Sequence, residues 1–488
     1  MKTKSYITTA IPYVNAQPHV GFALELVQAD AIARQQRRAG LRVRFQTGTD
    51  ENAFKNVEAA RGAGVDTHEW VATHAAQFRQ LADDLQISYD RFLRTTEAAH
   101  FQAVHALWRS LRPGDVYVKA YQGLYCSGCE DFLFAKDLID GQCPEHHRPP
   151  TEIAETNYFF RLSAYQEQIE QWLTSGALSI RPEKRRNEIL HFVRAGLQDI
   201  SISRLAERSD GWGVPVPDDP TQVVYVWIDA LVNYLAGLGY GAGDAWREWW
   251  NEETRKIHVI GRNVWKFHAV YWPALLLSAG LPLPDELVIH GFLTSDGQKI
   301  SKSLGNAISP DHYIHRYGVD AVRYFFLRAV SPFDDGDFSA LRFASIYEAD
   351  LANGLGNLVS RLLALASKCA LGSVAIEGSL ATNLDFEHAC NVFRHDEGLD
   401  LLWQKIAELN REIEQRKPWA SLQYGESAAV QAQVAAWLQS VGWIARNLEP
   451  FLPETADKIL RAIRCQPLKN VAPLFPRITA VATSHPME

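Results

Sequence analysis

The chain has 488 residues, of which 47% are hydrophobic and 22% charged, so it is a globular protein of several domains and neither disordered nor fibrous. Its net charge of −8 excludes a globally basic protein, and any nucleic-acid partner must be met by local patches. No apolar run approaches the roughly 20 residues of a membrane span. Six cysteines are too few for a disulfide scaffold, so we expect a cytoplasmic protein with reduced thiols.

Residues 1–100 alternate between strand-like and helix-like segments. A buried strand is predicted at 6–10, a helix begins near His19, and a second strand begins at 43–45 and ends in the loop 47–50. Gly40 lies where the C-terminal cap of the helix is expected. A strand, a helix and a strand in this order predict a parallel sheet with right-handed crossovers.

The pattern of apolar residues changes twice further along the chain. Cysteines, histidines and prolines interrupt every long period between 115 and 220, which indicates an insertion with a small core of its own. Strand-like runs return at 223–227, 256–260 and 287–290, so we expect residues 221–292 to complete the sheet. From about 345 onward, apolar residues recur at helical spacing and predict a helix bundle. One stripe comprises Leu351, Leu355, Leu358, Leu362 and Leu365.

A cluster of cysteines in the insertion has the spacing of a metal site. Two residues separate Cys126 from Cys129, and two separate Cys143 from His146. Three thiolates and one imidazole at this spacing can complete the tetrahedron of a structural zinc ion. His147 could replace His146, although the two-residue gap favours His146. We therefore predict one structural Zn²⁺ per chain.

Two further motifs suit the phosphates of a nucleotide. His19 and Gly21 open the first helix, where free N–H groups, a nearby imidazole and a close backbone approach favour a phosphate. Lys299 and Lys302 lie in a segment with serines and flanking glycines, residues 297–306. Such a cationic loop can neutralise a triphosphate while charge moves onto a leaving pyrophosphate.

Taken together, these two motifs resemble the two signatures of the class I aminoacyl-tRNA synthetases. Four further segments resemble the methionyl-tRNA synthetase family, as does the zinc knuckle. They are residues 10–15, 47–51, 225–230 and 267–274. The resemblance covers essentially the whole chain. It implies a ligase that activates methionine with ATP to give methionyl-adenylate and pyrophosphate, and then transfers methionine to the 3′-terminal ribose of tRNA.

The resemblance also implies an α/β architecture. A Rossmann-type, parallel-sheet catalytic domain (1–114 and 221–295) is split by a connective insertion that holds the zinc knuckle (115–220). A connecting region with the lysine loop (296–345) precedes an all-α, helix-bundle anticodon-binding domain (346–488).

The family's methionine pocket has aromatic walls, which suit a polarisable thioether. Asp50 matches the carboxylate that holds the substrate ammonium group. The residues that match the pocket walls are Ile11, Tyr13, Trp227, Tyr234, Phe267, His268 and Trp272.

The resemblance assigns roles at the nucleotide as well. His19 and Gly21 match the ATP-binding signature, and Lys302, assisted by Lys299, matches the lysine that stabilises the pentacoordinate phosphorus. Arg204 matches an arginine of the active site. The pair that lines the adenosine site corresponds to His290 and Gly291.

Residues of the last third match the family's anticodon readers. Asn357 and Arg361 are four apart and so share a helix face, and Trp419 matches a tryptophan on which an unstacked base can lie. The implied partners are initiator and elongator tRNA(Met), methionine, and ATP with Mg²⁺, without a membrane. We expect a monomer, because the chain ends without the dimerisation domain that some relatives append.

The sequence departs from the family pattern at a few positions. Phe22 replaces the second histidine of the helix-start signature, and a phenyl ring cannot donate to a phosphate. Asn52 and Asn263 also differ from the family's residues. The alternative is therefore a synthetase-derived paralogue that binds tRNA or methionine without adenylation, although the retained His19 and Asp50 favour the enzyme. The anticodon residues disfavour a ligase for another acceptor.

Overall fold

The computed structural model describes residues 2–126, 131–133, 138–144, 147–300, 308–374, 383–423, 427–465 and 472–478. The chain forms two compact units, Met1–Phe292 and Leu293–Glu488. The finer division into four parts stays a prediction. Among the helices that the structure describes, none combines the length and the apolar character of a membrane span.

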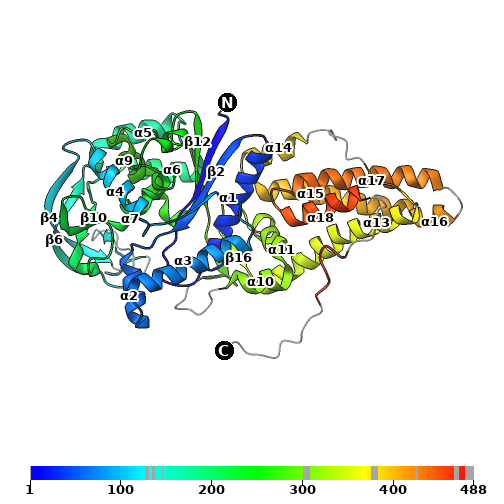
Figure 1. Ribbon diagram of the computed structural model, residues 1–488, viewed down its shortest axis with the longest axis horizontal. Helices are drawn as coiled ribbons and strands as arrows, with labels where there is room; N and C mark the ends of the chain where they lie inside the picture. Colours follow the sequence, from blue (N-terminus) through cyan, green and yellow to red (C-terminus); the bar gives the residue numbers. More distant parts are fainter. Residues whose placement is uncertain are drawn as a thin grey trace. The chain divides into compact units, whose positions relative to one another are not determined.

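The first unit is built on a parallel sheet with the strand order β3-β2-β1-β12-β13-β7 (Figure 1). Each strand pairs in parallel with its neighbours, which confirms the sheet predicted from the N-terminal segment. The strands are β1 (Lys4–Thr9), β2 (Arg42–Thr49), β3 (Arg91–Arg94), β7 (Ser179–Arg181), β12 (Thr254–Gly261) and β13 (Glu286–His290).

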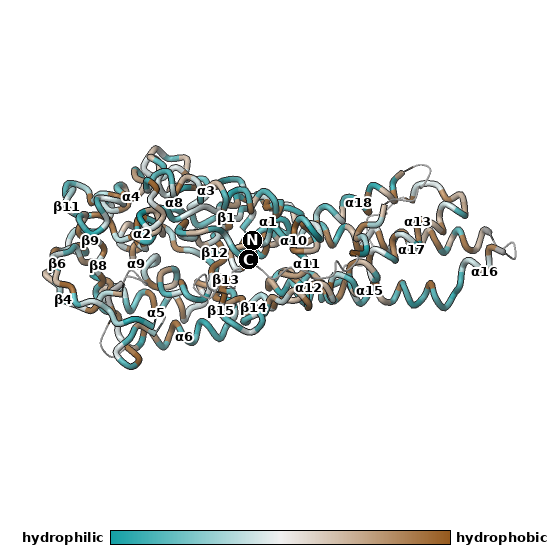
Figure 2. The backbone as a smooth tube through the Cα atoms, turned by 90° about the horizontal axis from the view of Figure 1, so that it is seen from below, coloured by the Kyte–Doolittle hydropathy of each residue, from teal (hydrophilic) through white to brown (hydrophobic). Residues whose placement is uncertain are grey.

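The chain adds strands outward from the centre of the sheet in two opposite directions, and this order determines on which face each connecting helix lies. From β1 the chain runs outward to β2 and β3 through α1 (Val20–Arg38) and α3 (Thr67–Asp84), whereas β12 leads to β13 through α9 (Trp272–Ser278). Right-handed crossovers then place α1 and α3 on one face and α9 on the other, as Figures 1 and 2 show. The gap between the carboxyl ends of β1 and β12 is a topological switch point, where sheets of this kind bind ligands.

Helix α1 begins and ends where the sequence predicts. His19 is the N-cap, and its Nδ1 accepts a hydrogen bond from the Gly21 N–H at 3.0 Å. Arg37 and Arg38 lie in the last turn, where positive charge favours the helix dipole. Gly40, with a φ of 85°, provides the left-handed residue that follows the C-cap.

One predicted strand of the main sheet is wrong. Residues 223–224 end β11 (Asp219–Val224), which pairs antiparallel with β9 in a separate small sheet, and Tyr225 is the N-cap of α7 (Val226–Leu231). Short apolar runs fit a buried strand and a buried helix start equally well. Two strands of the sheet are not predicted by the sequence patterns: β3, which pairs with β2, and β7, which lies within the predicted insertion and pairs with β13.

The insertion carries an antiparallel sheet in the order β5-β4-β6-β8. Its long strands are β4 (Val116–Cys126) and β6 (Thr151–Phe160), so Cys126 ends a strand. The remaining elements of the first unit are α2 (Phe54–Ala63), α4 (Ala98–Ser110), β5 (Asp131–Leu133), α5 (Gln166–Thr174), α6 (Glu183–Arg194), β8 (Ile200–Ser201), β9 (Ser203–Leu205), β10 (Pro215–Val216), α8 (Asn233–Ala236) and a π-helical segment, Phe267–Tyr271.

The second unit begins with a small sheet in the order β15-β14-β16 and continues as the predicted helix bundle. The five leucines of the sequence stripe are all buried, and each contributes about 1.5–3 kcal/mol relative to exposure. Hydrophobic and hydrophilic residues accordingly alternate along the bundle helices (Figure 2). Its elements are β14 (Leu293–Ser295), β15 (Gln298–Lys299), α10 (Pro310–Tyr317), α11 (Val319–Tyr324), β16 (Gly336–Phe338), α12 (Ala340–Ile346), α13 (Asn357–Lys368), α14 (Leu384–Asn391), α15 (His395–Arg416), α16 (Pro418–Gln423), α17 (Ser427–Leu448) and α18 (Pro453–Arg464).

Candidate active site

The start of α1 is shaped for a phosphate. His19 folds back over the first turn, and a Cβ at Gly21 would lie 2.8 Å from the imidazole Cε1. Only glycine fits at this position while His19 caps the helix. In the first turn the N–H groups of Gly21, Phe22 and Ala23 donate to His19, so this end of the helix offers a phosphate the His19 imidazole and the positive end of the helix dipole.

Phe22 belongs to the core between two helices. Its ring packs edge to face against Phe78 of α3, with centroids 5.0 Å apart, and the residue is 8% exposed. The pair contributes packing between α1 and α3 and offers no hydrogen-bond donor. Of the two signature positions, His19 alone carries an imidazole.

Asp50 lies at the carboxyl end of β2, close to the loop after β1. Its N–H donates to the Pro12 carbonyl at 2.8 Å, and Asp50 pairs with Tyr13 in an isolated parallel bridge. The residue is 1% exposed. The loops after β1 and β2 are thus tied together at the switch point, with the buried Asp50 in backbone register with Tyr13.

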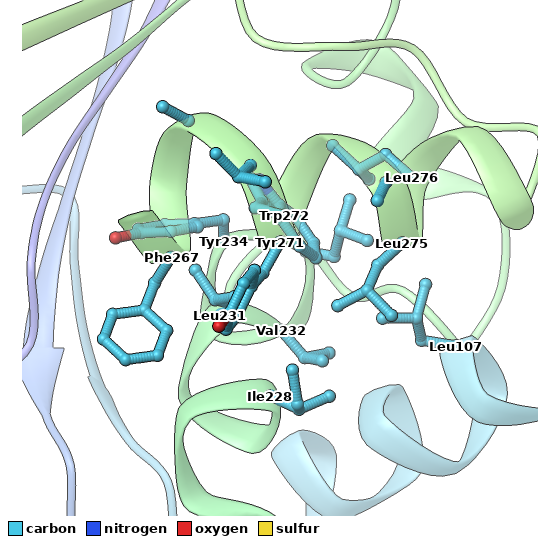
Figure 3. Close-up of a cluster of buried hydrophobic side chains, with 14 of the residues drawn as sticks. Leu107, Ile228, Leu231, Val232, Tyr234, Phe267, Tyr271, Trp272, Leu275 and Leu276 are labelled. Carbon is cyan, nitrogen blue, oxygen red and sulfur yellow. The ribbon is translucent and has the colours of Figure 1, made fainter. Parts of the chain in front are cut away.

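Trp227 links the aromatic residues that the sequence assigns to the methionine pocket. Its ring stacks face to face on Phe267 at 4.1 Å and lies 5.6 Å from the ring of Tyr13. Phe267 opens the π-helical segment, a feature often found at functional sites. Figure 3 shows Phe267, Tyr271 and Trp272 beside Tyr234 in one buried cluster. Half-buried Ile11 lies in the loop after β1.

Tyr234 and His268 form a buried, neutral pair. His268 Nδ1 lies 2.9 Å from the Val264 carbonyl and must carry the ring hydrogen, so Nε2 accepts from the Tyr234 hydroxyl at 2.6 Å. Burial lowers the pKa of His268 to about 4 and raises the pKa of Tyr234 well above 10. Trp272 is fully buried, with its ring 6.1 Å from Tyr234. This wall of the cluster suits an uncharged side chain.

A buried polar network, which the sequence interpretation missed, joins the loop of Asp50 to the helix of Trp227. Asp229 is fully buried, accepts from Asn52 Nδ2 at 2.7 Å and contacts His100 Nε2 at 2.5 Å. Asn52 follows Asp50 by two residues, and Asp229 follows Trp227 by two. The signal in the sequence is the single acid within the apolar run 225–232. The network fixes Trp227 relative to the carboxylate.

The residues that the sequence assigns to adenosine lie at and just after the end of β13. His290 ends β13; its Nε2 lies 2.9 Å from Glu25 Oε2, and its Nδ1 lies 2.8 Å from the Gly291 carbonyl oxygen. A Cβ on Gly261, the last residue of β12, would lie 3.6 Å from His290. Sequence reasoning missed Glu25 as the partner of His290; the signal that could have found it is an acid on the buried face of the predicted helix.

The remaining nucleotide residues are placed differently. Arg204 lies in β9 on the insertion side, with its guanidinium 4.0 Å above the ring of Tyr225, and donates to Ser201 Oγ at 2.9 Å. The backbone of Lys299 ends β15. The side chain of Lys299 and the whole of Lys302 lie outside the described residues.

Two of the four predicted zinc ligands lie in the described part of the insertion. Cys126 and Cys143 are buried, at the end of β4 and in the loop that follows β5 respectively. Cys129 and His146 lie outside the described residues. His147, the alternative ligand, is exposed. Among the described residues, no group of three or more histidine, cysteine, aspartate or glutamate side chains is arranged to hold a metal ion.

The second unit brings two of the predicted anticodon residues together. The Arg361 guanidinium lies 5.7 Å from the ring of Trp419 and pairs with Glu414 at 2.7 Å. Trp419 is 39% exposed, and Asn357, one turn before Arg361 on α13, is exposed as well. These residues offer a ring face, a cation and an amide to a ligand.

The sheet, its switch-point site and the histidine-capped helix define a nucleotide-binding α/β protein, and comparisons with known proteins identify its family. The family model described as tRNA synthetases class I (M) matches residues 5–152 and 146–363. A methionine–tRNA ligase of Thermotoga maritima is 39% identical over 94% of this chain and 75% of its own length. One of Rhizobium meliloti is 38% identical over 97% and 98%.

A solved structure agrees with these relatives. Mycobacterium tuberculosis methionyl-tRNA synthetase in complex with methionyl-adenylate superposes with a TM-score of 0.89 and 38% identity, over 98% of this chain and 100% of that one. The chain therefore belongs to the methionyl-tRNA synthetases, the methionine branch of the class I tRNA synthetases.

Replacing His268 by Gln is expected to flatten the pH dependence of stability. Because folding lowers the pKa of His268 from 6.5 to about 4, the unfolded chain takes up the proton first, and wild-type stability falls as pH drops through this window. The contribution of this residue is at most about 3 kcal/mol. Urea unfolding of both proteins near pH 7 and near pH 4.5 measures it. An equally steep decline in H268Q would contradict the neutral pair.

Proposed function

We propose that the chain activates methionine with ATP and transfers it to tRNA(Met). The observation that carries this proposal is the convergence at the switch point of Asp50, the rings around Trp227 and the histidine-capped start of α1. The buried carboxylate would hold the substrate ammonium group. The neutral aromatic wall with Tyr234 suits the thioether.

In the first step a methionine carboxylate oxygen attacks the α-phosphorus of ATP. The new P–O bond forms as the bond to pyrophosphate breaks, and pyrophosphate leaves with the electron pair. The carboxylate is already ionised, so no general base is needed, and positioning with charge neutralisation supplies the rate. His19 and the positive end of the α1 dipole would bind the phosphates, His290 and Gly291 would border the adenosine, and Mg²⁺ would enter with ATP.

Lys299 and Lys302 would neutralise the departing charge, a role that rests on their sequence motif. In the second step a hydroxyl of the terminal tRNA ribose attacks the activated carbonyl. The ester bond forms, AMP leaves with the electrons of the broken C–O bond, and the hydroxyl proton passes to solvent.

The other predicted features belong to the same proposal. Cys126, Cys129, Cys143 and His146 would hold a structural zinc ion, and the two buried cysteines fit thiolate ligands sheltered from solvent. Asn357, Arg361 and Trp419 would read the anticodon. A cytoplasmic monomer that acts on initiator and elongator tRNA(Met) completes the proposed picture.

Phe22 favours a second candidate, a paralogue that binds its ligands without adenylation. Its ring occupies the signature position with no donor and is held in the core by Phe78. The retained His19, Asp50 and Trp227 arrangement favours the enzyme.

Methionine-dependent exchange of labelled pyrophosphate into ATP, without tRNA, tests the first step. We expect exchange by the wild type and a fall in kcat/KM for methionine of about 10- to 100-fold in Asp50→Asn, because a charged hydrogen bond to the ammonium is lost. The substitution keeps the shape of the side chain, and equal melting temperatures would show that the variant folds. If folded wild-type protein catalyses no exchange, the proposed activation step is refuted and the paralogue that binds its ligands without adenylation is favoured.

Purified protein is expected to contain about one zinc ion per chain by elemental analysis. Replacing Cys126 or Cys143 by Ser should abolish zinc retention and destabilise the insertion, because thiolate ligands contribute binding energy to folding. Cys465→Ser is the matched control, since that cysteine is exposed and lies in the second unit. Zinc retained by both ligand variants would exclude the proposed site.

Trp419→Ala is expected to weaken aminoacylation of tRNA(Met) while pyrophosphate exchange stays unchanged. Loss of one base–indole stack costs about 1–3 kcal/mol, which corresponds to a rise in KM for tRNA of about 5- to 150-fold. Trp419→Phe keeps a ring and should lose less. A tRNA KM that does not change in the alanine variant would refute the anticodon assignment.

A further inference from the structure

The loop that leads from β1 to α1 is held by hydrogen bonds on both sides of Tyr13. The Asp50 N–H donates to the Pro12 carbonyl at 2.8 Å, and the Trp70 indole N–H donates to the Val14 carbonyl at 3.1 Å. The first bond comes from the residue after β2, whereas the second reaches the loop from α3. Because the carbonyl groups of both neighbours are fixed, the direction in which the Tyr13 side chain leaves the backbone is restricted as well.

The indole of Trp70 belongs to a stripe of rings on α3. His74 lies one turn further along the helix and stacks on Trp70 with ring centroids 4.1 Å apart, and Phe78 follows after another turn. The ring of Phe78 packs against Phe22, in the first turn of α1. This stripe therefore contacts the chain on both sides of His19: the loop before it and the helix after it.

The segment between these two contacts carries one residue for each activation substrate. Tyr13 lies 5.6 Å from the ring of Trp227 in the proposed methionine site, and His19, five positions after Val14, caps the helix at the proposed phosphate site. A loop that leaves this conformation must return to it when the first substrate binds, and this lowers the affinity for whichever substrate binds first. The second substrate then meets a loop that is already ordered.

We propose that Trp70 is a positioning residue for the activation of methionine, because its indole N–H keeps the loop of Tyr13 and His19 in the binding conformation before either substrate arrives. The proposal rests on the proposed function and adds a residue outside both substrate sites on which the affinity for both substrates depends. Trp70 lies outside every motif that carries the family resemblance.

Equilibrium binding of methionine to the full-length protein tests this role in Trp70→Phe, which keeps a ring and removes the indole N–H. Calorimetric titrations are made with Mg²⁺ alone and with a saturating ATP analogue whose α,β-bridging oxygen is replaced by a methylene group. Without the analogue, we expect the Kd for methionine to rise about three- to tenfold over wild type, because one hydrogen bond no longer orders the loop. With the analogue the rise should stay within about twofold, because a ligand at His19 has already ordered the loop.

Trp403→Phe is the matched control. It also removes an indole N–H bond to a backbone carbonyl, that of Asp350 at 3.3 Å, but within the second unit. Both dissociation constants should therefore keep their wild-type values. His74→Ala removes the ring that supports the indole and should give the same pattern as W70F with a smaller factor. It takes the place of W70F if the melting temperature shows that W70F does not fold.

Two outcomes would overturn the proposal. A Kd for methionine that equals the wild-type value in both titrations would show that the loop does not depend on Trp70. An equal rise in both titrations would show that the substitution damages the methionine site itself. If wild type binds both ligands but catalyses no pyrophosphate exchange, the activation step is refuted, whereas the comparison of W70F with wild type still decides the role of Trp70.

Discussion

The parallel pairing of β1 with β12 is the constraint on which the rest of the first unit depends. It joins Lys4–Thr9 to residues some 250 positions away, and both strands are buried on both faces of the sheet. Because side chains at the carboxyl ends of parallel strands meet at one edge, this register brings the loop of Tyr13 to Gly261 and, through β2 and β13, to Asp50 and His290. A shift of one residue would turn these side chains to the wrong face.

Within that frame, buried polar contacts hold the aromatic residues in place. Asp229 is held by Asn52 and His100, and the Tyr234 hydroxyl is held by His268. A buried polar group without a partner costs about 1–3 kcal/mol, so each contact favours one arrangement of the rings over its alternatives. The result is a neutral aromatic wall near the buried Asp50, the arrangement proposed above to hold an uncharged side chain and a charged amine.

Two of the departures from the family pattern, Phe22 and Asn52, have different structural consequences. Phe22 offers no donor and packs its ring against Phe78, so this position contributes to the contact between α1 and α3. Asn52 keeps a donor and uses it on Asp229. The first change concerns the position proposed to contact the phosphates. The second keeps the hydrogen bond that holds the residues proposed to bind methionine in place.

The sequence by itself determined the parallel sheet, the start of α1 at His19, the leucine-lined bundle and the family, because periodicity, capping residues and motifs are local properties of the chain. Only the tertiary structure decided that β7 forms the edge of the sheet, that residues 223–227 leave it, and that Glu25, His100 and Asp229 support the site. Three residues of strand carry too little pattern to be recognised, and a buried acid reveals its purpose only when its partner, distant in the sequence, is brought beside it. The physical reason is that these contacts are non-local: burial and hydrogen bonding select them after the sheet has formed.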